Sequence, residues 1–256
     1  MENEILTVEH AVKRFGGLTA LDAASIHVNK GEIVGLIGPN GAGKTTLFNA
    51  IDGVFRLTSG SVHFKGEDIS TLTPNRRCHI GIGRTFQITK PFGGMSVLEN
   101  VAVGAMFGER SSENMLSGKL MRQSMEYAEE VLKKMDFYDK KDVRASTLNV
   151  PERKRLEICR ALATKPDLLL LDEVIAGLNP SEVGGMVDLI RQVNQDGVTI
   201  LMIEHVMRAV MSLSDRMYVL NFGKLIAEGT PSEICANPIV IEAYLGKIGQ
   251  KEAKQC

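Results

Sequence analysis

Alternating hydrophobic and polar residues mark the first part of the chain. The runs at residues 4–15 and 23–38 have the period of two that indicates β-strands joined by turns. The second run ends in a buried strand, and residues 45–52 then read as a helix that stops at Gly53. Residues 59–70 read as another pair of strands with turn glycines.

The period becomes helical over residues 92–150. Residues 95–106 and 120–137 repeat hydrophobic positions at intervals of three and four, as amphipathic helices do. The sequence predicts helices in both segments. In the second, the residues expected to form one apolar stripe are Leu120, Met121, Met125, Ala128, Val131, Leu132 and Met135.

Strands and helices alternate again in the last third. Residues 166–173 form a continuous apolar run typical of a strand buried on both faces. A helix at 180–195, a strand at 198–205, a helix end and hairpin within 211–229, and a short helix at 238–246 follow. This alternation predicts an α/β fold with a parallel-sheet core, an N-terminal antiparallel β part and an inserted α-helical subdomain. The expected single domain has a core at 1–90 and 156–230, the helical subdomain at 91–155, and a C-terminal helix and tail at 231–256.

Composition argues against a nucleic-acid-binding, membrane-spanning or secreted protein. The 256 residues carry a net charge of −1, so a nucleic-acid partner is not expected. No apolar run reaches the roughly 18 residues of a membrane span, and the polar N-terminus does not resemble a secretory signal. The cysteines are widely separated, without metal-ligand spacing, and are expected to be reduced or inert thiols of a cytosolic chain: Cys78, Cys159, Cys235 and Cys256.

A phosphate-binding motif lies between the first buried strand and the first helix. The segment GPNGAGKT matches G-x-x-x-x-G-K-[ST] and has the required strand before it and helix after it. Backbone N–H groups converge on phosphate oxygens there, Lys44 reaches the terminal phosphates, and Thr45 offers a hydroxyl to Mg²⁺. The motif predicts a P-loop NTPase of the RecA-like type that uses ATP and Mg²⁺; the alternative is a glycine-rich turn before a lysine. The expected nucleotide-binding residues are Gly38, Pro39, Asn40, Gly41, Ala42, Gly43, Lys44, Thr45 and Thr46.

Two adjacent carboxylates end the buried strand at residues 166–173. Asp172 can hold a water of the Mg²⁺ shell, and Glu173 can activate an attacking water as general base. By itself the pair could also be an exposed acidic strand end. Together with the phosphate loop, it predicts ATP hydrolysis.

Three further motifs follow in an order that resembles the ATP-binding-cassette ATPases over nearly the whole chain. They are RTFQ with Gln87, the loop AGLNP with residues 177–179, and LMIEH with His205. The resemblance implies that Phe15 stacks on adenine, that Gln87 links the nucleotide and Mg²⁺ to the membrane partner, and that His205 contacts the γ-phosphate. It also implies that residues 177–179 cross a dimer interface. Taken alone, Phe15 could be core, Gln87 a surface amide, and His205 a strand-end histidine.

Longer segments resemble the ATPase subunits of branched-chain amino-acid importers. These are residues 81–105, 154–173 and 223–246, and urea-import and lipopolysaccharide-export ATPases are similar relatives. The resemblance implies permease subunits, a second ATPase subunit and, indirectly, a substrate-binding protein as partners. It also implies a peripheral location at the cytoplasmic face of the cell membrane. Residues 92–95 are one candidate lining for the groove that receives the permease; alternatively, they fasten the helical insert.

The loop LNVPE at residues 148–152, here called the capping loop, departs from the family's LSGGQ. It aligns with the loop that caps the partner's ATP, and Asn149, Val150 and Pro151 stand where serine and two glycines are usual. Pro151 has no N–H to donate, although the first helical turn accepts proline. We therefore expect Asn149 and Pro151 to be weak contacts in trans, and an unequal partner subunit is favoured over a homodimer. The alternatives to a hydrolysing transporter ATPase are a regulatory subunit with weak turnover, a non-transport cassette ATPase, or a kinase-like P-loop enzyme.

Overall fold

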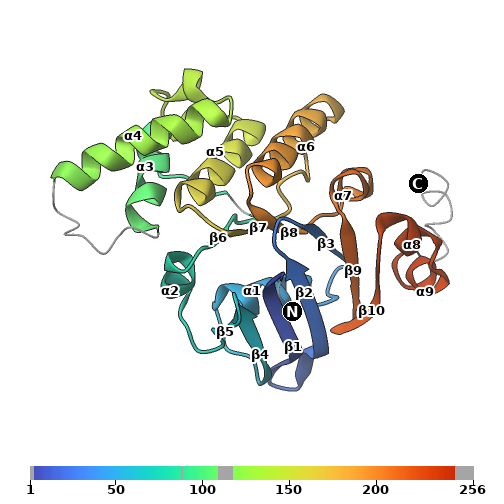
Figure 1. Ribbon diagram of the computed structural model, residues 1–256. Coiled ribbons are helices and arrows are strands. Elements are labelled where there is room, and N and C mark those ends of the chain that lie inside the picture. Colours follow the sequence, from blue (N-terminus) through green and yellow to red (C-terminus); the bar gives the residue numbers. More distant parts are fainter. Residues whose placement is uncertain (1–2, 88, 109–117, 246–256) are drawn as a thin grey trace. The chain divides into compact units, whose positions relative to one another are not determined.

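The computed structural model describes residues 3–87, 89–108 and 118–245. The chain divides into two compact units, one formed by the residues up to Pro74 and from Thr199 on, the other by Asn75–Val198 (Figure 1). This division does not follow the expected helical subdomain at 91–155, whose boundaries stay a prediction. The two units are described one after the other.

The first unit contains the predicted antiparallel sheet. Strands β1 (Glu4–Phe15), β2 (Leu18–Asn29), β4 (Ser59–Phe64) and β5 (Glu67–Asp68) lie in the order β2-β1-β4-β5, and every neighbouring pair is antiparallel. Val8 of β1 stands opposite Ile26 of β2 and Val62 of β4, and all three are buried. The alternation along these strands therefore turns one face of the sheet into a core.

The same unit contains parallel strands. Strand β3 (Ile33–Ile37) pairs in parallel with β8 (Thr199–Ile203) and β9 (Arg216–Asn221), and β10 (Lys224–Gly229) returns antiparallel to β9 as the predicted hairpin. Every residue of β3 and β8 is buried, as expected of strands covered on both faces. The unit's helices are α1 (Lys44–Asp52), α7 (Met207–Leu213), α8 (Pro231–Ala236) and α9 (Pro238–Val240), followed by a π-helical turn (Ile241–Leu245).

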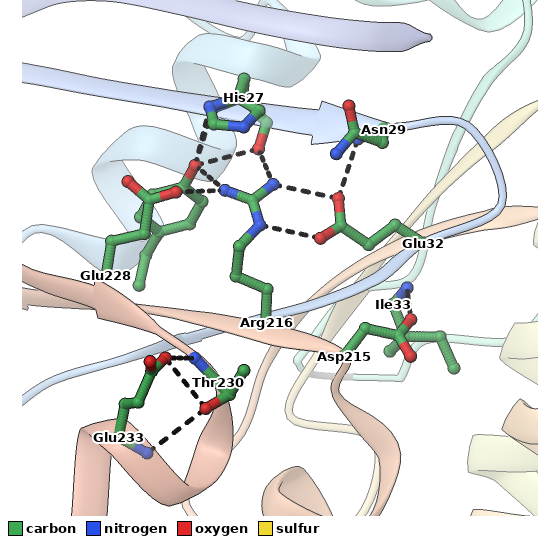
Figure 2. A network of polar contacts seen from close by, with 10 residues as sticks. His27, Asn29, Glu32, Ile33, Asp215, Arg216, Glu228, Thr230 and Glu233 are labelled. Atoms are coloured by element: carbon green, nitrogen blue, oxygen red, sulfur yellow. Dashed lines mark hydrogen bonds and ion pairs between the residues drawn. The ribbon is translucent and has the colours of Figure 1, made fainter.

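Arg216 ties β9 to the strands beside it (Figure 2). Its guanidinium donates to both oxygens of Glu32, at 2.8 and 3.0 Å, and to the carbonyl oxygen of His27 at 2.9 Å. Burial would raise the pKa of Glu32, but hydrogen bonds from Arg216 and from the N–H of Asn29 outweigh it and hold the pKa below its ordinary value. This network holds the start of β3, the strand whose other end continues into the phosphate loop.

The second unit combines two parallel strands with most of the helices. Strands β6 (Ile82–Arg84) and β7 (Leu168–Asp172) pair in parallel. Helix α3 (Val97–Phe107) packs on α4 (Gly118–Lys134) and α5 (Val150–Ala163), and α6 (Pro180–Gln195) has the predicted bounds. Short 3₁₀ turns lie at Tyr138–Lys140 and Ala145–Thr147. The sequence did not predict α2 (Pro74–His79), which begins at the last residue of the first unit.

Helix α4 corrects one expected position of the apolar stripe. Met121 is exposed, whereas Ser124 lies on the buried face with Leu120, Ala128 and Leu132. Because 3.6 residues complete a turn, Ser124 lies one turn from both Leu120 and Ala128. Position on the helix therefore outweighs the polarity of a small hydroxyl.

The described cysteines differ in exposure. Cys159 is buried, and burial raises its pKa to about 12, so its thiol stays protonated at neutral pH. Cys78 and Cys235 are partly exposed thiols outside any disulfide among the described residues, and Cys256 lies outside those residues. Within the described ranges, no helix combines the length and hydrophobicity that crossing a membrane requires.

Candidate nucleotide-binding and hydrolysis site

The phosphate loop joins β3 to α1 through glycines that no other residue could replace. Gly38 has φ 149°, and a Cβ there would lie 2.0 Å from the carbonyl oxygen of Leu220. Gly43, with φ 106°, precedes α1, and its Cβ would lie 2.5 Å from the carbonyl oxygen of Ala20. The loop can therefore lie this close to neighbouring backbone only with glycine at both positions.

Lys44 begins α1 and is held by the loop itself. Its Nζ donates to the carbonyl oxygens of Gly38 at 2.7 Å and Pro39 at 2.9 Å. The loop thus places a buried ammonium next to the N-terminus of a helix. Both features create positive potential, which suits phosphate binding.

Phe15 and His205 lie in the same unit as the loop. Phe15 ends β1 with 47% of its surface exposed, and its ring meets the ring of Phe55 edge-on, with 5.4 Å between centroids. An exposed aromatic face is what stacking on a base requires. His205 follows β8 and is half-buried. Their contacts with adenine and γ-phosphate stay predictions.

Asp172 lies at the end of β7 in the second unit and is paired with a residue that sequence reasoning did not single out. Nη2 of Arg84 donates to Oδ2 of Asp172 at 3.0 Å, and only 7% and 3% of the two side chains are exposed. Oγ1 of Thr85 accepts a hydrogen bond from the N–H of Asp172 at 3.1 Å. The segment RTFQ therefore positions the carboxylate through two of its residues.

Glu173 has a left-handed backbone, with φ 53°. This conformation is uncommon for residues other than glycine, and such strain concentrates at functional sites. Nε2 of Gln87 donates to Oε2 of Glu173 at 2.7 Å. The structure thus brings together Gln87, Asp172 and Glu173, three of the predicted site residues.

Lys154 is a second residue that sequence reasoning missed. It lies on α5 with 8% of its surface exposed, and Nζ donates to the carbonyl oxygens of Glu173, at 2.8 Å, and of Ala176. The signal was present in the sequence, because Lys154 shares the spacing of buried Glu157, Ile158 and Ala161 on one helix face. A lysine on a buried face predicts a specific polar partner.

The capping loop contains the first residues of α5, which begins at Val150. Asn149 is the N-cap: its Oδ1 accepts from the N–H of Glu152 at 3.0 Å, and the Glu152 carboxylate accepts from the N–H of Asn149 at 3.0 Å. That second hydrogen bond, with the ion pair to Lys140 at 3.1 Å, holds the pKa of Glu152 below its ordinary value despite partial burial. Because Oδ1 of Asn149 accepts within the helix, a contact in trans would use its side-chain NH₂.

The capping loop borders a cavity of about 450 Å³, which is also lined by Leu178 and Glu182. Asn179 caps α6 in the same way that Asn149 caps α5, and Gly177 has φ 78°. The capping loop and the loop at 177–179 therefore line one surface. Val150 is 55% exposed, so its side chain projects from the capping loop.

The donor types of the predicted site suit Mg²⁺. Among the described residues, no cluster of three or more His, Cys, Asp or Glu side chains could hold a metal ion by itself. Mg²⁺ keeps several waters and is commonly bound through one or two carboxylates together with substrate phosphates. Asp172 and Gln87 of the second unit carry hard oxygen donors of the kind that Mg²⁺ prefers, and so does Thr45 of the first unit; their roles as metal ligands stay predictions.

Known proteins are similar to this chain in both sequence and fold. The ABC transporter family matches residues 21–176, and a second family, "Branched-chain amino acid ATP-binding cassette transporter", matches residues 224–248. The chain is 39% identical to the high-affinity branched-chain amino acid transport ATP-binding protein BraF of Pseudomonas aeruginosa, with 96% of this chain and all of BraF covered. It is 38% identical to LivG of Escherichia coli K12, at the same coverage.

Solved structures agree with these matches. The fold is similar to that of a nucleotide-free ATP-binding cassette from an ABC transporter, with a TM-score of 0.86 and 36% identity over 95% of this chain and 100% of that one. A cassette in its ADP conformation gives a TM-score of 0.86 and 35% identity, covering 95% of this chain and 99% of the other. The predicted α/β fold and family resemblance are confirmed. The chain therefore belongs to the ABC transporter family, as an ATP-binding cassette ATPase.

Proposed function

We propose that this chain binds and hydrolyses ATP with Mg²⁺ and thereby powers the import of branched-chain amino acids through a membrane permease. The observation that supports this chemistry is the pair of carboxylates at the end of β7 and the start of the turn after it. There Asp172 is held by Arg84, and Glu173 is held by Gln87 at 2.7 Å. Two adjacent carboxylates with separate partners can take the separate roles of metal binding and general base.

The role proposed for each residue comes from its sequence motif and, for some residues, from the contacts described above. Lys44 and the N-terminus of α1 would bind the phosphates. Thr45 would bind Mg²⁺ through its hydroxyl, and Asp172 would hold a water of the Mg²⁺ shell. When bound, Mg²⁺ neutralises charge on the phosphate oxygens. Glu173 accepts a proton from the attacking water, Gln87 orients that water, and His205 contacts the γ-phosphate. Phe15 stacks on adenine.

The substrate class rests on the relatives. BraF and LivG are named as branched-chain amino acid transport proteins, and residues 224–248 match a family with the same substrate in its description. ATPases of urea importers and lipopolysaccharide exporters are the alternative within the same fold. The names of these relatives favour the amino-acid branch.

The altered capping loop supports an unequal pair of ATPase subunits. Pro151 has no N–H, and Val150 projects from the loop, so this chain is a poor cap for another subunit's ATP. Its own phosphate loop and carboxylates keep their expected residue types. The favoured arrangement is a heterodimer in which an intact partner caps the site of this chain, at the cytoplasmic face of the membrane.

The permease contact is proposed for RTFQ and the segment that follows it. Phe86 and Phe92 are exposed, and the guanidinium of Arg160 lies 4.9 Å from the centroid of the Phe92 ring. Exposed aromatic side chains are enriched in protein interfaces. Residues 92–95 therefore remain the candidate groove lining for a helix of the membrane subunit.

Uptake into membrane vesicles tests the proposed function. The transporter complex carrying this chain is reconstituted with its binding protein, and ATP-dependent uptake of radiolabelled leucine is compared with uptake of urea. We expect leucine uptake that is lost with Lys44→Ala, because the phosphates lose their cation, and kept with Lys119→Ala on the exposed start of α4. Uptake of urea alone, or leucine uptake that survives Lys44→Ala, would contradict the proposal.

A further inference from the structure

The ammonium of Lys154 lies inside the second unit, beside the turn that carries Glu173. Lysine is almost never buried unless its charge is compensated, because an ammonium loses its hydration there. Here Nζ donates to two main-chain carbonyl oxygens, those of Glu173 and Ala176. This buried charge therefore binds two carbonyl groups of one short stretch of backbone.

That stretch is the turn between β7 and α6. Glu173 begins it in a left-handed conformation, with φ 53°, and Gly177 ends it with φ 78°. The N–H of Leu178 donates to the carbonyl oxygen of Ile175 at 3.2 Å, which closes the turn. Because Lys154 bonds the carbonyls of residues 173 and 176, it holds both sides of this turn. The direction of the Glu173 side chain depends on that backbone.

Helix α5, which carries Lys154, starts at the capping loop. Asn149 is its N-cap, and Lys154 lies five residues later on the buried face. The same helix therefore bears the loop proposed to cap a partner's nucleotide and the ammonium that holds the backbone of Glu173. A displacement of the start of α5 would act on the Glu173 turn through these two hydrogen bonds.

We propose that Lys154 is a positioning residue for ATP hydrolysis, which links the capping helix to the general base of the same chain. The proposal rests on the function proposed above, since it assigns the hydrolytic role to Glu173. Lys154 touches neither nucleotide nor water in this role. It fixes the left-handed backbone of Glu173, so that the carboxylate stays aligned with the attacking water.

Kinetics of the assembled transporter test this role with three variants. Lys154→Met removes both hydrogen bonds at similar volume, Lys154→Arg keeps a cation with donors, and Lys119→Met on exposed α4 is the control. We expect Lys154→Met to lower kcat about 10- to 100-fold, as misplacement of a catalytic group by about 1 Å does. KM for ATP should change less than about twofold, because the phosphate loop is untouched. Lys154→Arg should regain most of the loss, and Lys119→Met should show none.

Hydrogen exchange of the full chain separates a local effect on the Glu173 turn from a general loss of stability. We expect the amides of residues 174–178 to exchange at least about tenfold faster in Lys154→Met, while β7 and α6 keep their protection. If Lys154→Met does not fold, Lys154→Gln replaces it under the same criteria. Wild-type kcat in a folded Lys154 variant, or exchange that rises equally throughout the chain, would overturn the inference.

A parallel Glu173→Gln variant separates the two proposals. If Glu173→Gln loses turnover and Lys154→Met keeps it, only the role of Lys154 is wrong. If Glu173→Gln keeps wild-type turnover, the assignment of the general base in the proposed function fails, and the inference fails with it.

Discussion

The residues that surround the two carboxylates explain why the site has its geometry. Asp172 and Glu173 are adjacent in sequence, yet Arg84 holds one and Gln87 the other. Both partners come from the four residues of RTFQ, which begin with the last residue of β6. Because β6 pairs in parallel with β7, the ends of both strands meet at one edge. The pairing of β6 with β7 therefore places the RTFQ side chains within hydrogen-bond distance of the two carboxylates.

Arg84 offers a test at the residue scale. We predict that Arg84→Met lowers the free energy of unfolding by about 3–5 kcal/mol, because it leaves a buried carboxylate without its guanidinium. Urea denaturation of the full chain measures this loss. The matched control is Arg122→Met, which removes an ion pair on exposed α4 and should leave the unfolding midpoint unchanged. An Arg84→Met variant as stable as the wild type would show that the ion pair does not support Asp172.

Sequence reasoning reached the carboxylates but not their partners. Gln87, Asp172 and Glu173 were recognisable because each stands in a short motif with a known order. Arg84 and Lys154 act through contacts with residues 88 and 19 positions away, and no local pattern records such a pairing. A charged residue on an otherwise buried face was the available signal.

At the scale of elements, prediction succeeded where a motif or a long period fixed the boundaries. Helix α1 stops before Gly53, which has φ 82°, and α6 begins after the capping residue Asn179. The six-residue helices α2 and α8 are too short for a hydrophobic period to show, although α8 has a capping box at Thr230. Short helices depend on packing rather than on a sequence pattern, so the sequence analysis did not predict these two.

The start of α5 carries a prediction about the capping loop. Replacing Val150 and Pro151 with glycine should raise turnover at the partner's site, up to about 10²-fold, because a backbone N–H and close approach are restored. Asn149 and Glu152 keep the capping box, so the helix should still form. The measurement is ATPase turnover of the assembled transporter, with Asn149→Ser as a control that retains the helix cap. Unchanged turnover in the double glycine variant would mean that the capping loop does not limit the reaction.

At the scale of the whole molecule, the residues proposed to act on the chain's own nucleotide match the family pattern better than those proposed to act on a partner's nucleotide. The residues proposed to act on its own nucleotide are those expected of a hydrolytic cassette, from Lys44 to Glu173. The residues proposed to act on a partner's nucleotide depart from the family pattern at Asn149, Val150 and Pro151. The chain is therefore predicted to be competent at its own site and weak as a cap, which favours a different partner subunit over a second copy of this chain.

The most direct measurement compares two substitutions in the assembled transporter. Glu173→Gln removes the proposed general base of this chain, and the matching change removes that of the partner ATPase. We predict that Glu173→Gln abolishes most of the ATP turnover, since in the proposed heterodimer an intact partner caps the site of this chain. The partner's substitution should have the smaller effect, because its site depends on the altered capping loop. A more damaging effect of the partner's substitution would contradict the account.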